Sequence, residues 1–308
     1  MSANDLAPLL LKFPEDIIRD ILEILARSDT RMALNLLVVS RKFHEWTESV
    51  LYDMVWLGSE EQADLFIRTT KSKPAHFFER VKILCLTYTI GHDRAAEILP
   101  YCTKLEGLAC WVPDTMGLPK LKDFTTPRCL SLNLSVTLNE YSGPDFGLPL
   151  FSNVTHLEFL DDTDLCMVWE GFELMPCLTH LAFTWSTRIP LREVITHPGR
   201  ALHACPQLKV LVLMRPNFDQ EPATEGYRIF LDPRCVILHQ PDYDVRDIRA
   251  DWEAQWFGEP NMWRTAEEVA KMQASLPSIP PPPPSALLPP PEIGLPGYDR
   301  TGETMKYR

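Results

Sequence analysis

The side chains that could do chemistry in this 308-residue chain are acidic residues, histidines and cysteines. Asp161, Asp162 and Asp164 form a short acidic run, and carboxylate oxygens are the ligands that a hard cation such as Ca²⁺ prefers. The same spacing is common in solvated loops, and the run directly follows a predicted strand. We therefore interpret it as a loop and predict no metal site there.

Two histidines, His156 and His180, stand 24 residues apart, each after a threonine and before a leucine. Matching neighbours at a fixed interval indicate equivalent positions in a repeat, so we interpret the pair as shared repeat sequence and not as metal ligands. The eight histidines of the chain do not converge in sequence with a cysteine or serine that could act as a nucleophile.

The eight cysteines form no C-x-x-C pair and no zinc-ligand spacing. Most stand beside leucine, valine or methionine, which predicts buried thiols in a reducing compartment. The chain contains no G-x-S-x-G, H-E-x-x-H, P-loop or G-x-G-x-x-G motif. We therefore predict a protein that is not an enzyme and has no catalytic residue, cofactor or metal; an enzyme with an unrecognised site remains the alternative.

Charge and hydropathy narrow the classes of partner. The formal net charge of −12 disfavours nucleic acid and anionic membrane surfaces, because both repel an acidic protein. No window of about 18 apolar residues is present, and the first residues lack the basic segment of a signal peptide. These features predict a protein of the cytosol or nucleus that binds neither nucleic acid nor membrane.

The N-terminal region reads as three short helices. Pro14 begins the first, whose apolar side chains fall on one broad arc when drawn at 100° per residue. The second helix, over residues 32–39, is apolar nearly all round, and Ser40 caps the third. A further helix is predicted from Ser59 to about Thr70 by a capping-box pattern. The arc is wider than a three-helix core can cover, which indicates an interface.

From residue 81 the chain repeats an L-x-x-L-x-L pattern. Its middle leucines stand at 84, 108, 157, 181 and 211, at intervals of 24, 49, 24 and 30 residues, and Leu130 to Leu134 lie midway in the long interval. One strand in every 24–30 residues is typical of leucine-rich repeats, although the usual asparagine is missing. We predict about six irregular repeats that stop past Asp232.

In such repeats, the positions between and just after the last two apolar residues line one concave face. This row is largely apolar, which indicates a groove for a protein or peptide; the alternative is that loops or a C-terminal helix cover it. The candidate substrate face consists of Trp111, Glu158, Leu160, Thr184 and Met214.

The C-terminal region changes character twice. Val245, Ile248, Trp252 and Trp256 share one face of a predicted helix, which we expect to cap the last repeat. A second short helix is predicted from Thr265. Residues 277–296 hold ten prolines and predict an extended polyproline II tail without a core.

The N-terminal region resembles an F-box, whose pattern is Leu-Pro-x-Glu, paired aliphatic residues, a second apolar helix and Val-Ser-Arg-x-Phe. Here the chain reads Phe13-Pro14-Glu15-Asp16-Ile17-Ile18, Ile21-Leu22, then Val39-Ser40-Arg41-Lys42-Phe43. Phe13 and Asp16 depart conservatively from the pattern. The remainder is similar to the leucine-rich-repeat-like regions that follow F-boxes in many fungal proteins.

The resemblance implies an α+β chain: a three-helix F-box, an irregular leucine-rich-repeat-like α/β solenoid, and a C-terminal capping helix. The expected division is F-box 10–57, linking helix 58–75, repeats 76–240, capping helices 241–275 and a proline-rich tail 276–308.

The same resemblance implies a partner and a role. An F-box binds a Skp-type adaptor and through it a cullin, so the chain would recruit an unknown protein substrate to a ubiquitin ligase. A scaffold acting outside a ligase is the second alternative. By resemblance the adaptor contacts are Pro14, Ile17, Ile18, Ile21 and Leu22.

Overall fold

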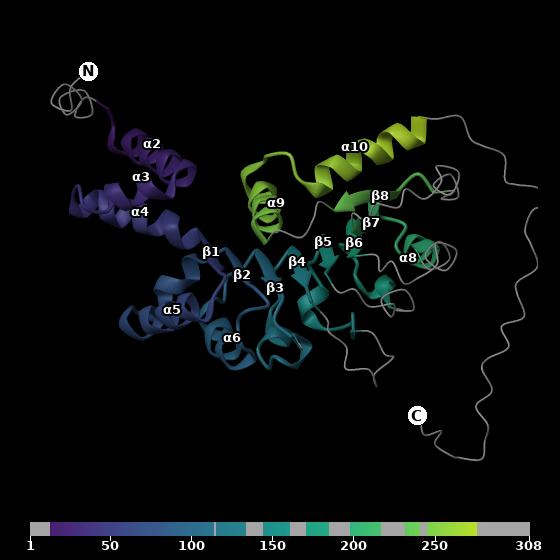
Figure 1. Cartoon of the computed structure of the whole chain (residues 1–308), viewed down its shortest axis with the longest axis horizontal. Helices are drawn as coiled ribbons and strands as arrows, with labels where there is room; N and C mark the ends of the chain where they lie inside the picture. The colour runs from purple at the N-terminus through teal and green to yellow at the C-terminus, as the bar shows by residue number, and fades with distance from the viewer. Residues whose placement is uncertain are drawn as a thin grey trace, which may run out of the picture. The chain divides into compact units, whose positions relative to one another are not determined.

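The computed structural model describes residues 13–113, 115–133, 144–160, 171–184, 198–216, 232–240 and 245–275 (Figure 1). The chain divides into two compact units, Met1–Ala274 and Ser275–Arg308. Apart from Ser275 itself, every element below belongs to the first unit. The acidic run at residues 161–164 and the proline-rich tail lie outside the described residues.

Three helices open the described chain: α2 (Glu15–Ser28), α3 (Thr30–Leu36) and α4 (Arg41–Asp53). Their starts follow from local chemistry. The Asp29 side chain accepts a hydrogen bond from the backbone of Arg31 at the start of α3, and the Ser40 hydroxyl accepts one from Phe43 at the start of α4. The predicted third helix and its cap are confirmed.

The three helices share a small apolar core. Its buried members are Leu22, Ala26, Ala33, Leu36 and Val50. Ile18, Phe43, Trp46 and Leu51 pack against them while partly exposed. So few fully buried side chains give little area for folding alone, because small cores are marginally stable.

Eight strands form one sheet in which every neighbouring pair is parallel and the order follows the chain, from the first strand to the eighth. The strands are β1 (Met54–Leu57), β2 (Ile83–Leu86), β3 (Gly107–Cys110), β4 (Cys129–Leu132), β5 (His156–Phe159), β6 (His180–Thr184), β7 (Val210–Pro216) and β8 (Cys235–Gln240). The prediction of a mixed chain of helices and strands is confirmed: the described residues form an α/β structure.

The repeated leucines stand in register across the sheet. Each pairs with its equivalent on the next strand, and all are almost completely buried. The row consists of Leu84, Leu108, Leu130, Leu157, Leu181 and Leu211. The strands predicted from the leucine pattern are therefore confirmed in position, including the one that begins near Leu130.

Two strands were not predicted. β1 directly follows α4 and pairs with β2, within the range expected to belong to the helices. β8 pairs with β7 beyond Asp232, where the leucine pattern was expected to stop, although it lies inside the range 76–240 expected for the repeat region. Neither strand carries the full leucine pattern. Each pairs with a neighbouring strand that does carry it.

Short helices connect the strands and cover one face of the sheet. They are α5 (Glu60–Ser72), α6 (His92–Ile98) and α8 (Pro198–Ala204), with 3₁₀ turns η1 (Ala75–Arg80), η2 (Leu99–Tyr101), η3 (Thr115–Gly117), η4 (Leu121–Asp123), η5 (Pro149–Phe151) and η7 (Phe172–Leu174). The main core lies between these segments and the leucine row. Residues that alternate with the leucines face the other way.

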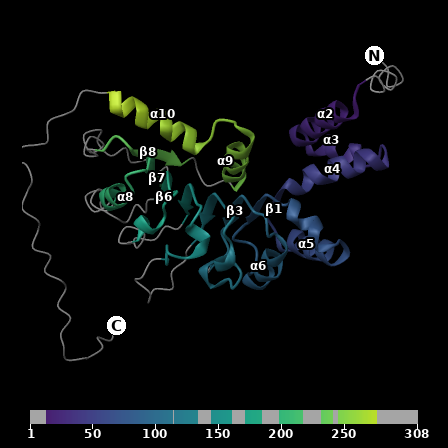
Figure 2. The ribbon, with the colours of Figure 1, turned by 180° about the vertical axis from the view of Figure 1, so that it is seen from behind.

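The opposite face is covered by α9 (Val245–Phe257) and α10 (Met262–Ser275), which lie across the sheet from α5 and α6 (Figures 1 and 2). The tryptophan-rich helix was expected to cap the last repeat, and this is wrong. Trp252 of α9 packs with Cys85 of β2 and Ala109 of β3. An apolar face is available there, whereas the edge of the sheet offers mainly backbone groups.

The described cysteines are free thiols, and six of them are buried: Cys85, Cys102, Cys110, Cys129, Cys205 and Cys235. Burial in apolar surroundings raises the pKa of the Cys102 thiol to about 12, which keeps it protonated and unreactive. No helix in the described part of the chain combines the length and apolar content that crossing a bilayer requires.

Candidate functional site

The helices α2 and α3 carry a large apolar surface on a unit that is otherwise polar. Its most exposed member is Val38, at 84% of its full accessible area. We define the helical surface as Phe13, Ile17, Ile21, Ile24, Leu25, Met32, Leu34, Val38 and Val39, each of which is exposed. Exposed apolar residues gathered on one small unit are typical of a protein interaction site.

The residues predicted to contact an adaptor divide into two groups. Ile17 and Ile21 are exposed on the helical surface, and Pro14 is exposed just before α2. Ile18 is half-buried, and Leu22 is only 5% exposed because it packs in the core of the three helices. The amphipathic pattern placed the four aliphatic residues on one arc but could not distinguish the side of the arc that packs in the three-helix core.

An ion pair attaches the helical unit to the chain that follows. Lys73, just past α5, contacts Glu48 of α4 at 2.7 Å, whereas the pair of Arg27 and Asp53, at 3.2 Å, joins α2 to the end of α4 within the unit. Desolvation of Asp53 raises the pKa of its carboxyl, opposed by the hydrogen bond from Arg27. These contacts lie away from the helical surface and leave it accessible within the described chain.

The predicted substrate face lies under α9 and α10. We call this sheet face the covered face; its buried members are Ile83, Cys85, Ala109, Trp111, Cys129, Ala182, Val210, Val212, Met214 and Val236. Trp252 of α9 packs on its first half, and Trp263 of α10 packs on its second half. The alternative considered from sequence, a groove covered by C-terminal helices, describes this arrangement.

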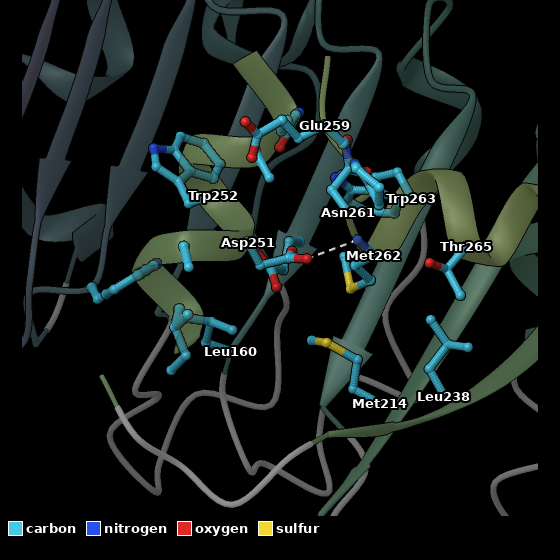
Figure 3. A pocket seen from close by; sticks show the side chains of 17 residues that line it. Leu160, Met214, Leu238, Asp251, Trp252, Glu259, Asn261, Met262, Trp263 and Thr265 are labelled. Atoms are coloured by element: carbon cyan, nitrogen blue, oxygen red, sulfur yellow. Dashed lines mark hydrogen bonds between the residues drawn. The ribbon is translucent and has the colours of Figure 1, made fainter. Parts of the chain in front are cut away.

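A cavity of about 710 Å³ remains between the covered face and the two helices. Four of the five predicted substrate-face residues line it: Trp111, Glu158, Leu160 and Met214. Thr184 does not; its buried hydroxyl donates to the Phe159 carbonyl at 3.4 Å. Figure 3 shows the cavity with Asp251 and Trp252 of α9 on one side and Met214 and Leu238 on the other.

Two carboxyl groups in the cavity are perturbed by their surroundings. Desolvation raises the pKa of Glu158 to about 7, with a further rise from the nearby Asp251 charge and a partial reduction from hydrogen bonding to Ser131. The pKa of Asp251 is also raised, again by desolvation first, although its Oδ1 accepts a hydrogen bond from the Met262 backbone at 2.8 Å. Ser131 in turn accepts from the Trp111 indole at 2.9 Å.

His156 and His180 meet beside the cavity as parallel rings, with centroids 4.0 Å apart. The Trp263 ring meets both edge-on, and Glu267 of α10 lies 3.1 Å from Nε2 of His180. Desolvation lowers the pKa of His156 to about 3, so it is neutral near pH 7. The interpretation as shared repeat sequence agrees with this stack, and no group of three metal-ligating side chains occurs among the described residues.

Sequence reasoning missed the contribution of the C-terminal helices to this site. Asp251, Trp252 and Glu259 line the cavity with Met262 and Trp263. The signal was present, because the amphipathic helix with two tryptophans was recognised, but its position over β2 and β3 follows only from the shape of the assembled sheet.

Comparison with known proteins gave no match to a family model, to a curated protein or to a solved structure.

Proposed function

We propose that this protein is an F-box adaptor that recruits a substrate to a Skp–cullin–F-box ubiquitin ligase and does no chemistry itself. The observation that carries the proposal is the helical surface: apolar residues exposed on a three-helix unit whose residue order resembles an F-box. Three consecutive helices, α2, α3 and α4, over the residues that carry the resemblance support the proposal.

Burial energetics support the use of this surface as an interface. Removing apolar area from water contributes about 25 cal/mol per Å², so covering several exposed isoleucines and valines gives a strong driving force for association. Ile17 and Ile21 stand one turn apart on α2 and are both exposed, which suits a partner groove that accepts one helical face. Leu22 supports this surface from the core instead of touching the partner.

The remainder of the chain suits a spacer and recruiting platform. Eight parallel strands in chain order, with helical segments described in every connection from β1 to β7, support a leucine-rich-repeat-like solenoid. Holding a bound substrate near a loaded conjugating enzyme raises the effective concentration of its lysines. The same architecture would serve a scaffold that binds a Skp-type protein without a ligase, and cullin recruitment separates the two roles.

Co-expression of the full chain with a Skp-type adaptor tests the proposal. We expect a stable one-to-one complex, which then retains a cullin in a second pull-down. Pro14→Ala combined with Ile21→Asp is expected to abolish the complex, because an aspartate buried in an apolar interface costs several kcal/mol without a partner.

Leu65→Asp is the matched control. Leu65 is also an exposed apolar residue on a helix, at 51% exposure, but it lies on α5. Loss of binding in this control would point to general destabilisation. A Pro14→Ala and Ile21→Asp variant that still binds the adaptor at wild-type strength would refute the assignment of the interface.

A further inference from the structure

The cavity under α9 and α10 has an unusual combination of size, lining and charge. Its volume of about 710 Å³ lies within the range of about 300–1,000 Å³ found for small-molecule sites. Both walls belong to the same chain: strand residues such as Met214 and Leu238 form one, and α9, α10 and the segment joining them form the other (Figure 3).

The lining is apolar and aromatic, with acids but no base. Among the described lining residues are three tryptophans, Trp111, Trp252 and Trp263, and none is a lysine, arginine or histidine. Glu158, Asp251 and Glu259 supply carboxyl groups. Glu158 and Asp251 are half-buried and Glu259 is exposed. A carboxylate withdrawn from water is favoured by a cationic partner, because desolvating an isolated charge is costly.

Arg249 of α9 has partners outside the cavity. Arg249 contacts Glu253 at 2.6 Å, and its guanidinium lies 5.3 Å from the ring centre of Trp56. Desolvation and the Asp251 charge both raise the cost of ionising Glu158, and no cation compensates it within the described lining. A ligand that brought a positive charge would relieve this cost.

We propose that this cavity binds a small organic amine, with its ammonium group against Glu158 and Asp251 and its apolar body on the tryptophan rings. Aromatic faces attract cations through their quadrupole, and carboxylates complete such sites with charge-assisted hydrogen bonds. An anionic ligand would meet the same three acids and be repelled. The inference concerns the sheet and its C-terminal helices, and it does not rest on the proposed function.

Three matched probes test the charge requirement on the full chain: naphthylethylamine, naphthylethanol and naphthylpropanoate, which share an aromatic body and differ in charge. Isothermal titration at pH 8 is expected to show the amine binding at least about tenfold more tightly than the alcohol, and the propanoate not binding. Equal affinity for amine and alcohol, or no binding of any probe, would overturn the proposal.

A pH series on the unmodified protein needs no variant. Glu158 takes up a proton as the pH falls below about 7, so the affinity for the amine is expected to fall severalfold from pH 8 to pH 6. The alcohol should bind equally at both values, and an amine affinity independent of pH would count against the assigned carboxyl groups.

Two substitutions localise the site. Glu158→Gln and Asp251→Asn are each expected to lower the preference for amine over alcohol by about tenfold while leaving alcohol binding intact, which also shows that the variant is folded. Asp123→Asn is the matched control, since Asp123 pairs with Lys120 on the surface and does not line the cavity. A preference that survives both cavity substitutions would place the ligand elsewhere.

Discussion

The helical surface and the covered face are both apolar, yet the protein treats them in opposite ways. The apolar side chains of α2 and α3 stay exposed, while those of the second sheet face are buried under α9 and α10. Sequence patterns predicted an interaction surface in both places. The difference shows that an apolar stripe identifies a surface that requires a partner, and that the partner can be another segment of the same chain.

The largest expected effect on stability comes from removing the packing of α10 on the covered face. Trp263→Ala removes a side chain that is only 7% exposed and packs on both stacked histidines. We expect a loss of about 3–5 kcal/mol in the free energy of unfolding, measured by urea denaturation. Phe257→Ala at 48% exposure is the control and should cost far less. A loss for Trp263→Ala as small as that for Phe257→Ala would mean that α10 contributes little to the fold.

A substitution on β3 tests the packing of α9 on the covered face. A Cβ atom built on Gly107 would lie 2.1 Å from the Trp256 ring, so Gly107→Ala must displace that tryptophan or the backbone of α9. We expect a cost of about 1–3 kcal/mol, typical of overpacking. In a Trp256→Ala background the same substitution should cost little, because the obstructing ring is gone. Additive costs would show that the two residues do not interact.

The raised pKa of Glu158 gives a third test, through the pH dependence of stability. The folded pKa of Glu158, about 7, lies above its ordinary value of 4.5, so the stability it contributes is present below pH 4.5 and lost as the pH rises through 7. Glu158→Gln should therefore be more stable than the wild type by about 1–2 kcal/mol at pH 8 and equal to it at pH 4.5.

Thermal unfolding at the two pH values measures this difference. The histidine pair also destabilises the protein as the pH falls below 6.5, because the pKa of His156 is lowered to about 3. That effect is the same in both proteins and cancels in the comparison. A Gln variant less stable than wild type at pH 8 would contradict the burial of an unpaired acid.

The smallest expected effect is on the open surface. Val38→Ser replaces an exposed apolar residue on the helical surface, and the free energy of unfolding should change by less than about 0.5 kcal/mol. Val50→Ser, in the buried core of the same helices, is the contrasting variant and should cost far more. A large loss from Val38→Ser would show that the helical surface is already covered within the chain.

The sequence allowed prediction of what depends on local pattern. The leucine period located six strands because each repeat places Leu84 or its equivalent in the same environment. β1 and β8 could not be located this way, since β1 is specified by its pairing of Val55 with Leu84. The site divides similarly: Glu158 and Met214 were predicted on one face, but Asp251 reaches the cavity only through tertiary packing of α9.

The late position of α9 and α10 in the sequence has a consequence for synthesis. Residues 245–275 leave the ribosome after all eight strands, so the growing chain carries an uncovered apolar sheet face until these helices emerge. Contacts such as Trp256 on Gly107 join segments far apart in the chain and form slowly for that reason. The nascent protein is therefore most prone to aggregation just before its last helix appears, and a chaperone that binds apolar sheet would act in that interval.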